Sequence, residues 1–510
     1  MRKINELKAG AILSYVNLAI SCIIPLLYTP IMLSILGQAE YGLYSLSNSV
    51  ISYLALLNFG MGSAVMRYVA KARAEERKDD VEKVVGTFTI IYFALAFLVI
   101  VVGGILTIYS DVFFASGLTP SEISKLKILM IIMSISTAVS FPVSVYSSVA
   151  VAYEKYLFRR LFDVAGTILT PILNLVVLYA GWGSIGMALV GLLIQVIYAP
   201  VFVGYCLKTL HIKPRFSKLS VGLFKEIFGF SAFVFLSMIV DMLYWATDKV
   251  IIGAMIGSVA VAIYNVGGVF TSMLQQMASA ISNVFTPRVT TMVVTSESMD
   301  EISNLMIRIG RLQYLIVSFI LSGYIVFGKI FIHFWAGDSY MDAYIIALLV
   351  MVPLAVPLIQ NIAYNTILAQ KKHQFRAIMY SIIAVINVIS TIIVIPYYGI
   401  IGAAMCTGVA YLIGNGLIMN IYYYRVTKLD IPRFWKNISV MTIVPLVLSA
   451  FSYIIVNQII TNVSVVTFLI EVIVFSLVYI VLTWIFTMNT YEKDIFKGMF
   501  GKIIRRKHNK

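Results

Sequence analysis

The sequence predicts an all-α membrane protein with fourteen transmembrane helices, and three observations carry this prediction. The first is composition. Of the 510 residues, 60% are hydrophobic and only 12% are charged, too few to cover the surface of a soluble domain. The second is that apolar runs of about 20 residues, the length that crosses a bilayer, recur along nearly the whole chain. The third is the distribution of the cations between the loops.

The apolar runs divide the chain into fourteen predicted spans. An even number of spans places both termini on the same side of the membrane. The spans cover residues 10–36, 43–70, 84–109, 126–153, 158–180, 185–207, 229–254, 259–286, 306–331, 342–369, 376–397, 400–424, 437–458 and 464–487.

The lysines and arginines indicate which side that is. Of the 38 cations, 34 fall on the face that the two termini share. The opposite face carries only three, Lys125, Lys127 and Lys329, and Lys249 lies within a predicted span. Because short cytoplasmic loops collect positive charge, we expect both termini to be cytoplasmic. The same distribution accounts for the net charge of +15 without a nucleic-acid partner.

Two pairs of short segments indicate an internal repeat. "LGQAEYGLY" and "IGSVAVAIY" align at an offset of 220, which places Gly37 on Gly257 and Tyr44 on Tyr264. "GSIGMAL" (183–189) and "GIIGAAM" (399–405) align at an offset of 216. We therefore expect spans 1–6 and 7–12 to be two lobes with the same orientation, related by an axis along the membrane normal. Parallel repeats of this kind are typical of transporters, whose substrate site lies between the halves near mid-membrane.

The repeat predicts three parts of the chain. Residues 1–212 form an N-terminal six-helix lobe, and residues 213–426 form a second six-helix lobe that begins with an amphipathic linker. Residues 427–510 supply helices 13 and 14 and a basic amphipathic cytoplasmic tail. In the linker and in the tail, apolar residues recur at helical spacing beside basic residues. This pattern is typical of helices that lie on an anionic leaflet. Ordinary solvated segments are the alternative.

The predicted span 229–254 carries unusual charges. In "MIVDMLYWATDKVIIGAMIG", at about 100° per residue, Asp241 and Asp248 lie about 20° apart around the helix, with Tyr244, Trp245 and Lys249 close to the same face. An ionised side chain at the centre of a membrane helix costs about 2.5–3.5 kcal/mol. We therefore expect this face to border a polar cavity. The alternative is an ion pair of Lys249 with either aspartate that only docks helices.

Other ionisable residues are weaker candidates. Arg67 and Arg288 end predicted spans on the cytoplasmic side, where each would contact an anionic head group or simply snorkel to the interface. Glu471 lies inside the last span with no cation nearby, and is a candidate for proton coupling or for facing an amphipathic groove. Asp163 follows Arg159 by four residues, the spacing of a structural helix ion pair.

The sequence contains no recognisable catalytic, nucleotide-binding or metal-binding motif. It has no His/Cys/carboxylate cluster, no Walker A loop and no nucleophile elbow, so we expect neither an enzyme nor a cofactor or metal site. The three cysteines are dispersed in apolar runs and predict no disulfide framework. Without an ATP site, transport would depend on an ion gradient, the membrane potential or the substrate's own gradient.

Two long stretches carry a family resemblance. "LSILGQAEYGLYSLSNSVISYLALLNFGMGSAVMRYVAK" and "ATDKVIIGAMIGSVAVAIYNVGGVF", the latter followed by "FTPRV", resemble the oligosaccharide flippases of bacterial polysaccharide synthesis. These belong to the superfamily that also holds multidrug (MATE) exporters and lipid II flippases. The resemblance implies fourteen helices in the bacterial cytoplasmic membrane. It also implies that an undecaprenyl-pyrophosphate-linked oligosaccharide is moved from the inner to the outer leaflet by alternating access, for surface polysaccharide synthesis.

Three functions stay open at this point. In a flippase, Lys249 and Arg67 would contact the pyrophosphate, Tyr244 and Trp245 would stack on sugar rings, and Asp241 would carry a coupling proton or repel a misplaced phosphate. Its partners would be the lipid-linked oligosaccharide, membrane lipids and the polymerase or glycosyltransferases of the pathway. In a multidrug exporter, Asp241 and Asp248 would exchange a cationic drug for H⁺ or Na⁺. A lipid II or spore-cortex-type flippase is a further alternative, although arginines well inside spans 1 and 8, which lipid II flippases carry, are missing here.

Overall fold

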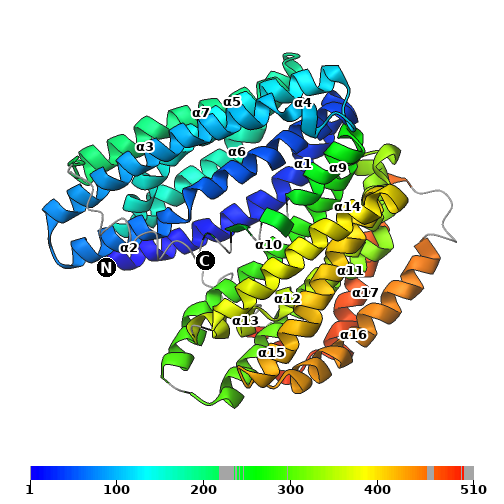
Figure 1. Cartoon of the computed structure of the whole chain (residues 1–510). Helices are drawn as coiled ribbons and strands as arrows, with labels where there is room; N and C mark the ends of the chain where they lie inside the picture. Colours follow the sequence, from blue (N-terminus) through cyan, green and yellow to red (C-terminus); the bar gives the residue numbers. More distant parts are fainter. Residues whose placement is uncertain are drawn as a thin grey trace, which may run out of the picture. The chain divides into compact units, whose positions relative to one another are not determined.

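A computed structural model shows the arrangement of the chain (Figure 1). It describes residues 2–216, 235, 238–239, 242–244, 246–295, 297–370, 372–456, 464–495 and 497–498. Every regular element within these ranges is a helix, so the all-α prediction is confirmed for the described part of the chain. Residues 217–234, which include most of the predicted amphipathic linker, and most of the basic tail lie outside the described residues.

The helices group into two units by their mutual contacts. Unit 1 comprises residues 1–266 and 377–406, and unit 2 comprises residues 267–376 and 407–510. Unit 1 contains α1 (Arg2–Ser52), η1 (Tyr53–Asn58), α2 (Met61–Ala74), α3 (Lys78–Ile108), α4 (Ser110–Phe113), α5 (Pro120–Ala152), α6 (Tyr156–Tyr179), α7 (Gly183–Gly204), η2 (Tyr205–Thr209) and α9 (Thr247–Met255), with parts of α10 (Ser258–Val294) and α14 (His373–Tyr411).

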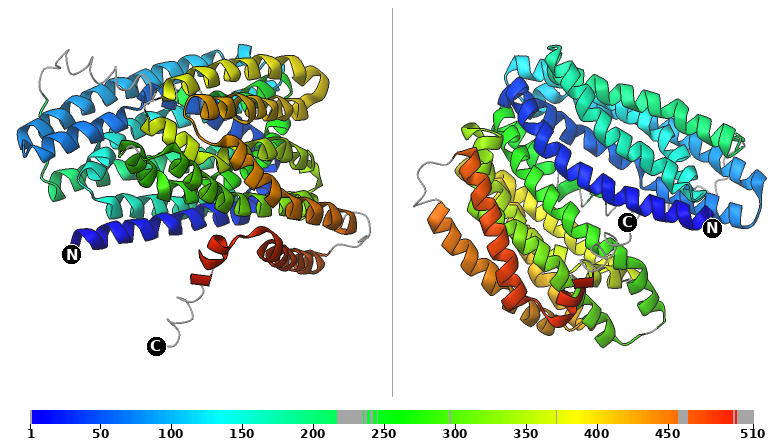
Figure 2. Two further views of the ribbon diagram at one scale, coloured as in Figure 1. Left: turned by 90° about the horizontal axis from the view of Figure 1, so that it is seen from below. Right: turned by 180° about the vertical axis from the view of Figure 1, so that it is seen from behind.

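Unit 2 holds the remaining helices. Besides the rest of α10 and α14, it contains α11 (Met299–Trp335), η3 (Asp338–Tyr340), α12 (Asp342–Ile359), α13 (Asn361–Ala369), η4 (Leu412–Ile418), α15 (Met419–Arg425), α16 (Ile431–Ile454), α17 (Val465–Leu482) and η6 (Thr483–Thr487). Figure 2 shows both units from two further sides. In unit 1, α5 packs between α3 and α7, and in unit 2, α11 packs against α12, α16 and α17.

Helix starts follow the sequence chemistry that predicts them. Thr119 caps α5 in a capping box with Glu122, and Pro120 occupies the first turn, where its missing N–H is no loss. Asp430 caps α16, where its side chain accepts a hydrogen bond from the backbone N–H of Arg433. Ser464 and Thr467 form a second capping box at the start of α17. These caps fix where the chain turns back into the membrane.

Eleven of the described helical segments are long and apolar enough to cross a membrane, which makes the chain a multi-pass membrane protein. Two of them, Val16–Ala74 with 59 residues and Gln374–Arg425 with 52 residues, exceed twice the length of about 20 residues that one crossing needs. Each contains a glycine with a non-helical backbone, Gly37 and Gly399. The predicted span 229–254 is only partly described, so the count of fourteen stays a prediction.

Four glycines of the repeat segments have a positive φ. Gly37 has φ 72° and its counterpart Gly257 has φ 129°, while Gly183 and its counterpart Gly399 both have φ 56°. This left-handed region favours glycine because it has no Cβ. The correspondence between the two repeat copies stays a prediction. The parallel arrangement of the lobes, and the boundaries at 212 and 426, stay predictions.

The last two long helices, α16 and α17, pack on α11 within unit 2 through an apolar cluster. Val326 and Phe327 of α11 are buried against side chains of α16 and α17, including Leu448, Phe475 and Tyr479. The rings of Phe327 and Phe475 pack edge to face with centroids 5.4 Å apart. A second contact is polar, because Ser318 and Tyr479 share a hydrogen bond of 2.8 Å. These contacts attach α16 and α17 to α11.

Candidate functional site

The charged face predicted for residues 229–254 is partly described. Helix α9 begins at Thr247, and Asp248 in its first turn is only 2% exposed. Lys249 is half-buried beside it. Asp241 and Trp245 lie outside the described residues, so their place on this face stays a prediction.

Hydrogen bonds hold the polar start of α9 to its neighbours in unit 1. The phenol of Tyr264 in α10 donates a hydrogen bond of 2.5 Å to Oδ2 of Asp248. The hydroxyls of Tyr53 and Thr247 lie 2.5 Å apart. A buried carboxylate that receives a hydrogen bond keeps a polar environment inside an apolar bundle. Asp248 is therefore held by a phenol from another helix.

The alternative ion pair is not seen in the described part of the chain. Lys249 forms no ion pair there with any carboxylate. Any pairing with Asp241 falls outside the described residues. A lysine without a paired carboxylate in an apolar helix is costly unless water or an anionic ligand reaches it. This arrangement leaves the ammonium of Lys249 available to an anion.

The remaining predicted residues lie on other elements. Tyr244 is 6% exposed, and its ring packs edge to face on Tyr380 of α14 with centroids 6.1 Å apart. Arg67 is exposed on α2 of unit 1, and Arg288 is exposed on the part of α10 that belongs to unit 2. Glu471 is half-buried on α17, and its Oε2 has no hydrogen-bond partner among the described residues. The structure thus places Asp248 and Lys249 together in the first turn of α9, while Tyr244 precedes that helix and contacts α14.

Glycines pack tightly where α1, α9, the start of α10 and the chain before α5 meet within unit 1. A Cβ at Gly42 would lie 1.8 Å from the carbonyl oxygen of Ser258, and one at Gly117 would lie 2.3 Å from that of Gly253. A Cβ at Gly257 would lie 2.7 Å from the carbonyl oxygen of Gly117. Real side chains cannot approach backbone atoms this closely, so only glycine permits the contact. We call these four glycines and Ser258 the close-packed end.

Carboxylates strengthen the contacts around the close-packed end. Glu122, at the start of α5, accepts a hydrogen bond of 2.5 Å from the hydroxyl of Ser258. Glu40 in α1 lies 2.7 Å from the ammonium of Lys125 and accepts a hydrogen bond of 2.7 Å from the backbone N–H of Ser184 in α7. Because Lys125 belongs to the predicted external face, these contacts lie on the side that we expect to face outwards.

Sequence reasoning missed most of these partners. Tyr264 appeared only as the repeat counterpart of Tyr44, and Gly42 and Gly253 only as parts of the family patterns. Glu122 forms a capping box, whose spacing is readable in sequence, but its bond to Ser258 joins residues 136 positions apart. The polar residues that form such long-range contacts carry no local signal of their partners.

The fold is similar to those of several solved membrane transporters. A structure described as "Lipid II flippase MurJ, inward closed conformation" matches at a TM-score of 0.73 and 16% identity, over 94% of this chain and 98% of that one. An inward-facing multidrug resistance MATE family transporter of the MOP superfamily matches at a TM-score of 0.65 and 16% identity, over 84% of this chain and 99% of that one. A mutant of the Vibrio cholerae MATE transporter VcmN matches at a TM-score of 0.57 and 12% identity, over 84% of this chain and 99% of that one.

These likenesses establish the fold of the chain and leave its substrate open. No curated protein sequence matches the chain significantly. A protein-family model described as "Polysaccharide biosynthesis protein" matches residues 7–293, which is more than half of the chain. The match spans the stretches around Gly42 and around Asp248 and Lys249 that carry the resemblance in the sequence. The chain therefore belongs to the polysaccharide biosynthesis protein family.

Proposed function

We propose that this protein is a flippase. It moves an undecaprenyl-pyrophosphate-linked oligosaccharide from the inner to the outer leaflet of the bacterial cytoplasmic membrane, with both termini in the cytoplasm. Membership of the polysaccharide biosynthesis family supports the substrate class, and the fold shared with a lipid II flippase and with MATE transporters supports transport. The observation that carries the proposal is the available ammonium of Lys249 beside the buried, hydrogen-bonded Asp248.

The pyrophosphate is the part of such a substrate that Lys249 would bind. An anion compensates the charge of a lysine in an apolar helix, so binding would remove part of the cost of keeping that charge there. The hydrogen bond from Tyr264 would hold the carboxylate of Asp248 towards α10, while its negative charge still acts on the neighbouring ammonium. Arg67 and Arg288 would receive the head group near the cytoplasmic surface, and Tyr244 and Trp245 would contact sugar rings once the substrate separates Tyr244 from Tyr380.

Alternating access requires a contact that closes one side and can open. The close-packed end suits this role because its glycines let helices meet backbone to backbone, and its hydrogen bonds are few. Opening would separate Ser258 from Gly42 and Glu122 and release the substrate outwards. Asp241 and Glu471 are the candidates for a proton that couples this change to an ion gradient.

A multidrug exporter is the second candidate function, and the MATE matches favour it. The match to the MATE transporter covers 84% of this chain, whereas the match to the lipid II flippase covers 94%. The family model is described as a polysaccharide biosynthesis protein, which favours the flippase. In an exporter, Asp248 would bind a cation. The hydrogen bond from Tyr264 makes that carboxylate less available to a drug.

Reconstitution into proteoliposomes distinguishes the two functions. A lipid-linked oligosaccharide placed in the inner leaflet should become accessible to an external sugar-modifying reagent faster than in protein-free vesicles. A cationic dye should not accumulate in response to a proton or sodium gradient. Dye transport without movement of the lipid-linked sugar would overturn the proposal. In cells, deletion should abolish surface polysaccharide and leave drug sensitivity unchanged.

A further inference from the structure

A groove of about 190 Å³ lies in unit 2, between the start of α14 and the end of α15. Both of these helix ends belong to the face that we expect to be cytoplasmic. The groove is lined by Phe375, Ile418, Ile421, Tyr422, Arg425 and Val426. Phe375, Ile421 and Val426 are each more than 40% exposed. Exposed apolar side chains that lie together on a membrane protein are suited to contact with lipid.

A ring stack and two hydrogen bonds fix the shape of the groove. The rings of Phe375 and Tyr422 are parallel, with centroids 4.3 Å apart. The phenol of Tyr422 donates a hydrogen bond of 3.2 Å to the carbonyl oxygen of Lys372. The ammonium of Lys372 donates one of 3.3 Å to the carbonyl oxygen of Val426. Because Val426 lines the groove and follows Arg425 directly, the ammonium of Lys372 lies at the rim that Arg425 also borders.

The charge at this rim is positive. Lys372 and Arg425 are both exposed, and neither belongs to an ion pair with any other described residue. The sequence has no aspartate or glutamate between residues 343 and 429, and Asp430, the first one after them, caps α16. Cations at the cytoplasmic end of membrane helices attract anionic head groups. A guanidinium is also well matched to two oxygens of one phosphate.

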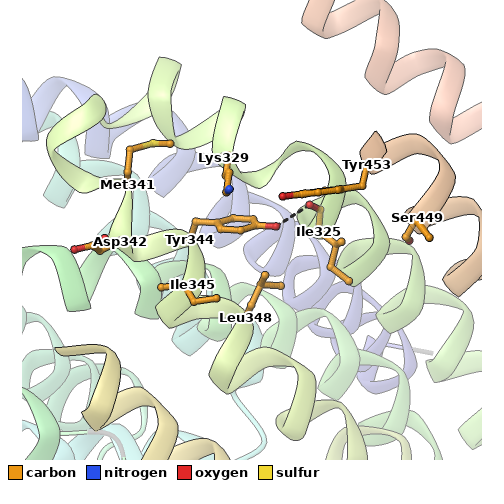
Figure 3. Close-up of a pocket in the computed structure, with 10 residues that line it drawn as sticks. Ile325, Lys329, Met341, Asp342, Tyr344, Ile345, Leu348, Ser449 and Tyr453 are labelled. Atoms are coloured by element: carbon orange, nitrogen blue, oxygen red, sulfur yellow. Dashed lines mark hydrogen bonds between the residues drawn. The ribbon is translucent and has the colours of Figure 1, made fainter. Parts of the chain in front are cut away.

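A larger pocket of unit 2 lacks such convergence. It has a volume of about 730 Å³ and lies between α11, α12 and α16 (Figure 3). The ammonium of Lys329 lies there 5.5 Å from the centre of the Tyr344 ring. Asp342 and Ser449 lie at opposite ends of this pocket, and Asp342 is directed away from Lys329. Its polar groups therefore do not meet at one position, which makes Lys329 a suitable control.

We propose that the groove between α14 and α15 binds an anionic glycerophospholipid of the inner leaflet, of the phosphatidylglycerol type. Arg425 and Lys372 bind the phosphodiester, and part of an acyl chain lies in the groove against Phe375, Ile421 and Ile418. The negative charge of this lipid compensates the two cations. Phosphatidylethanolamine fits less well, because its ammonium would lie beside two cations with no carboxylate to receive it.

The lining favours a phospholipid over a lipid-linked sugar. Apart from Arg425 and Tyr422, the side chains that line the groove are apolar, and the phenol of Tyr422 already donates to Lys372. Sugar hydroxyls would lose water here without gaining hydrogen bonds. The site is therefore separate from Lys249 and does not depend on the proposed transport function. Because α14 passes from unit 2 into unit 1 at residue 377, a lipid bound at Phe375 stabilises the chain just before that point.

Lipid retention by the full-length protein tests the proposal. The purified protein is equilibrated in detergent with equal amounts of phosphatidylglycerol and phosphatidylethanolamine, delipidated stepwise, and analysed by native mass spectrometry. We expect phosphatidylglycerol to be retained preferentially. Arg425→Gln should reduce its retention by about tenfold, as for the loss of one charge-assisted hydrogen bond, and should remove most of the preference. Ile421→Trp keeps both cations but fills the groove, so it should reduce the retention of phosphatidylglycerol as well.

Lys329→Gln is the matched control, because it removes an exposed cation of the same unit that borders the larger pocket. It should leave the preference unchanged. Added phosphatidylglycerol should raise the thermal stability of the unmodified protein and of the Lys329 variant, and raise that of the Arg425 variant less.

Equal retention of the two phospholipids by the unmodified protein would overturn the proposal, as would tighter retention of undecaprenyl phosphate. The same loss of phosphatidylglycerol in the Lys329 and Arg425 variants would also contradict it.

Discussion

Tyr264 and Asp248 form a buried hydrogen bond of 2.5 Å between α10 and α9. Tyr264 belongs to the same helix as Ser258 of the close-packed end, and Asp248 precedes Lys249, the residue that we propose binds the pyrophosphate. The phenol holds the carboxylate of Asp248 towards α10, directly beside the lysine that follows it in the sequence. The hydrogen bond thus links the packing of the first helices to the chemistry proposed for transport.

Removing the phenol of Tyr264 should destabilise the protein. Tyr264→Phe leaves the buried carboxylate of Asp248 without this donor, and a hydrogen bond to a charged group contributes about 1.5–3 kcal/mol. Asp248→Asn in the same chain removes the charge, so the double variant should lose less stability than the two single losses added together. Thermal unfolding in detergent measures this cycle. Additive losses would mean that the two side chains are not coupled.

Cross-linking across the close-packed end should stop flipping. Cysteines replacing Glu122 and Ser258, in a chain whose Cys22, Cys206 and Cys406 are changed to serine, lie near enough for a short bifunctional thiol reagent. If this end must open outwards, a reagent with a reducible spacer should abolish flipping and a reductant should restore it. Either cysteine alone, treated in the same way, provides the control. Full activity after complete cross-linking would contradict the assigned gate.

The close approach at Gly42 should not tolerate a methyl group. Gly42→Ala places a Cβ against the backbone of Ser258, so the helices must separate. We expect a lower thermal stability and a greater reactivity of a cysteine at position 258 towards an impermeant thiol reagent. Gly104→Ala is the matched control, since Gly104 lies in the helix α3 with open space around it. That variant should be neutral or gain up to about 1 kcal/mol from helix propensity.

A buried ion pair should hold the chain after α17 to α11. Arg311 donates to both oxygens of Glu492, at 2.6 and 3.0 Å, and to the carbonyl oxygen of Thr487, and both charged side chains are at most 9% exposed. Glu492→Gln leaves the guanidinium without its counter-charge, which should cost about 3–5 kcal/mol. Thermal unfolding and limited proteolysis of the C-terminal segment measure the effect.

The matched comparison is Asp163→Asn. Asp163 pairs with Arg159 and with Arg160, each at 3.2 Å, at a partly exposed position where each ion pair contributes less than about 1 kcal/mol. A similar loss in both variants would contradict the distinction between buried and exposed pairs. A small loss for Glu492→Gln alone would mean that the segment is held by other contacts.

Local patterns predicted the elements and contacts that depend on neighbours in sequence. The i,i+4 spacing of Arg159 and Asp163 predicted an ion pair, and the structure contains it. Composition and apolar runs predicted an all-α membrane protein, which the described helices and the family match support. The repeat offsets predicted a correspondence between Gly37 and Gly257, and both adopt positive φ.

Contacts between distant residues had no such signal. Arg311 and Glu492 are 181 residues apart, and neither was singled out, because a basic residue and an acidic residue near cytoplasmic helix ends are common on a membrane protein surface. An ion pair of Asp248 with Lys249 was the alternative considered from the sequence, and the hydrogen bond that the phenol of Tyr264 donates to Asp248 was not foreseen. Which helices meet depends on packing, and one sequence shows only the order in which they are connected.

Flipping by Lys249 variants tests the central claim most directly. Proteoliposomes carrying the lipid-linked oligosaccharide are compared for Lys249→Ala, Lys249→Arg and the control Lys127→Ala, with thermal unfolding confirming that each variant folds. The account predicts that Lys249→Ala abolishes flipping, that Lys249→Arg retains part of it because the positive charge remains, and that Lys127→Ala is fully active. A normal flipping rate in a folded Lys249→Ala variant would contradict the account.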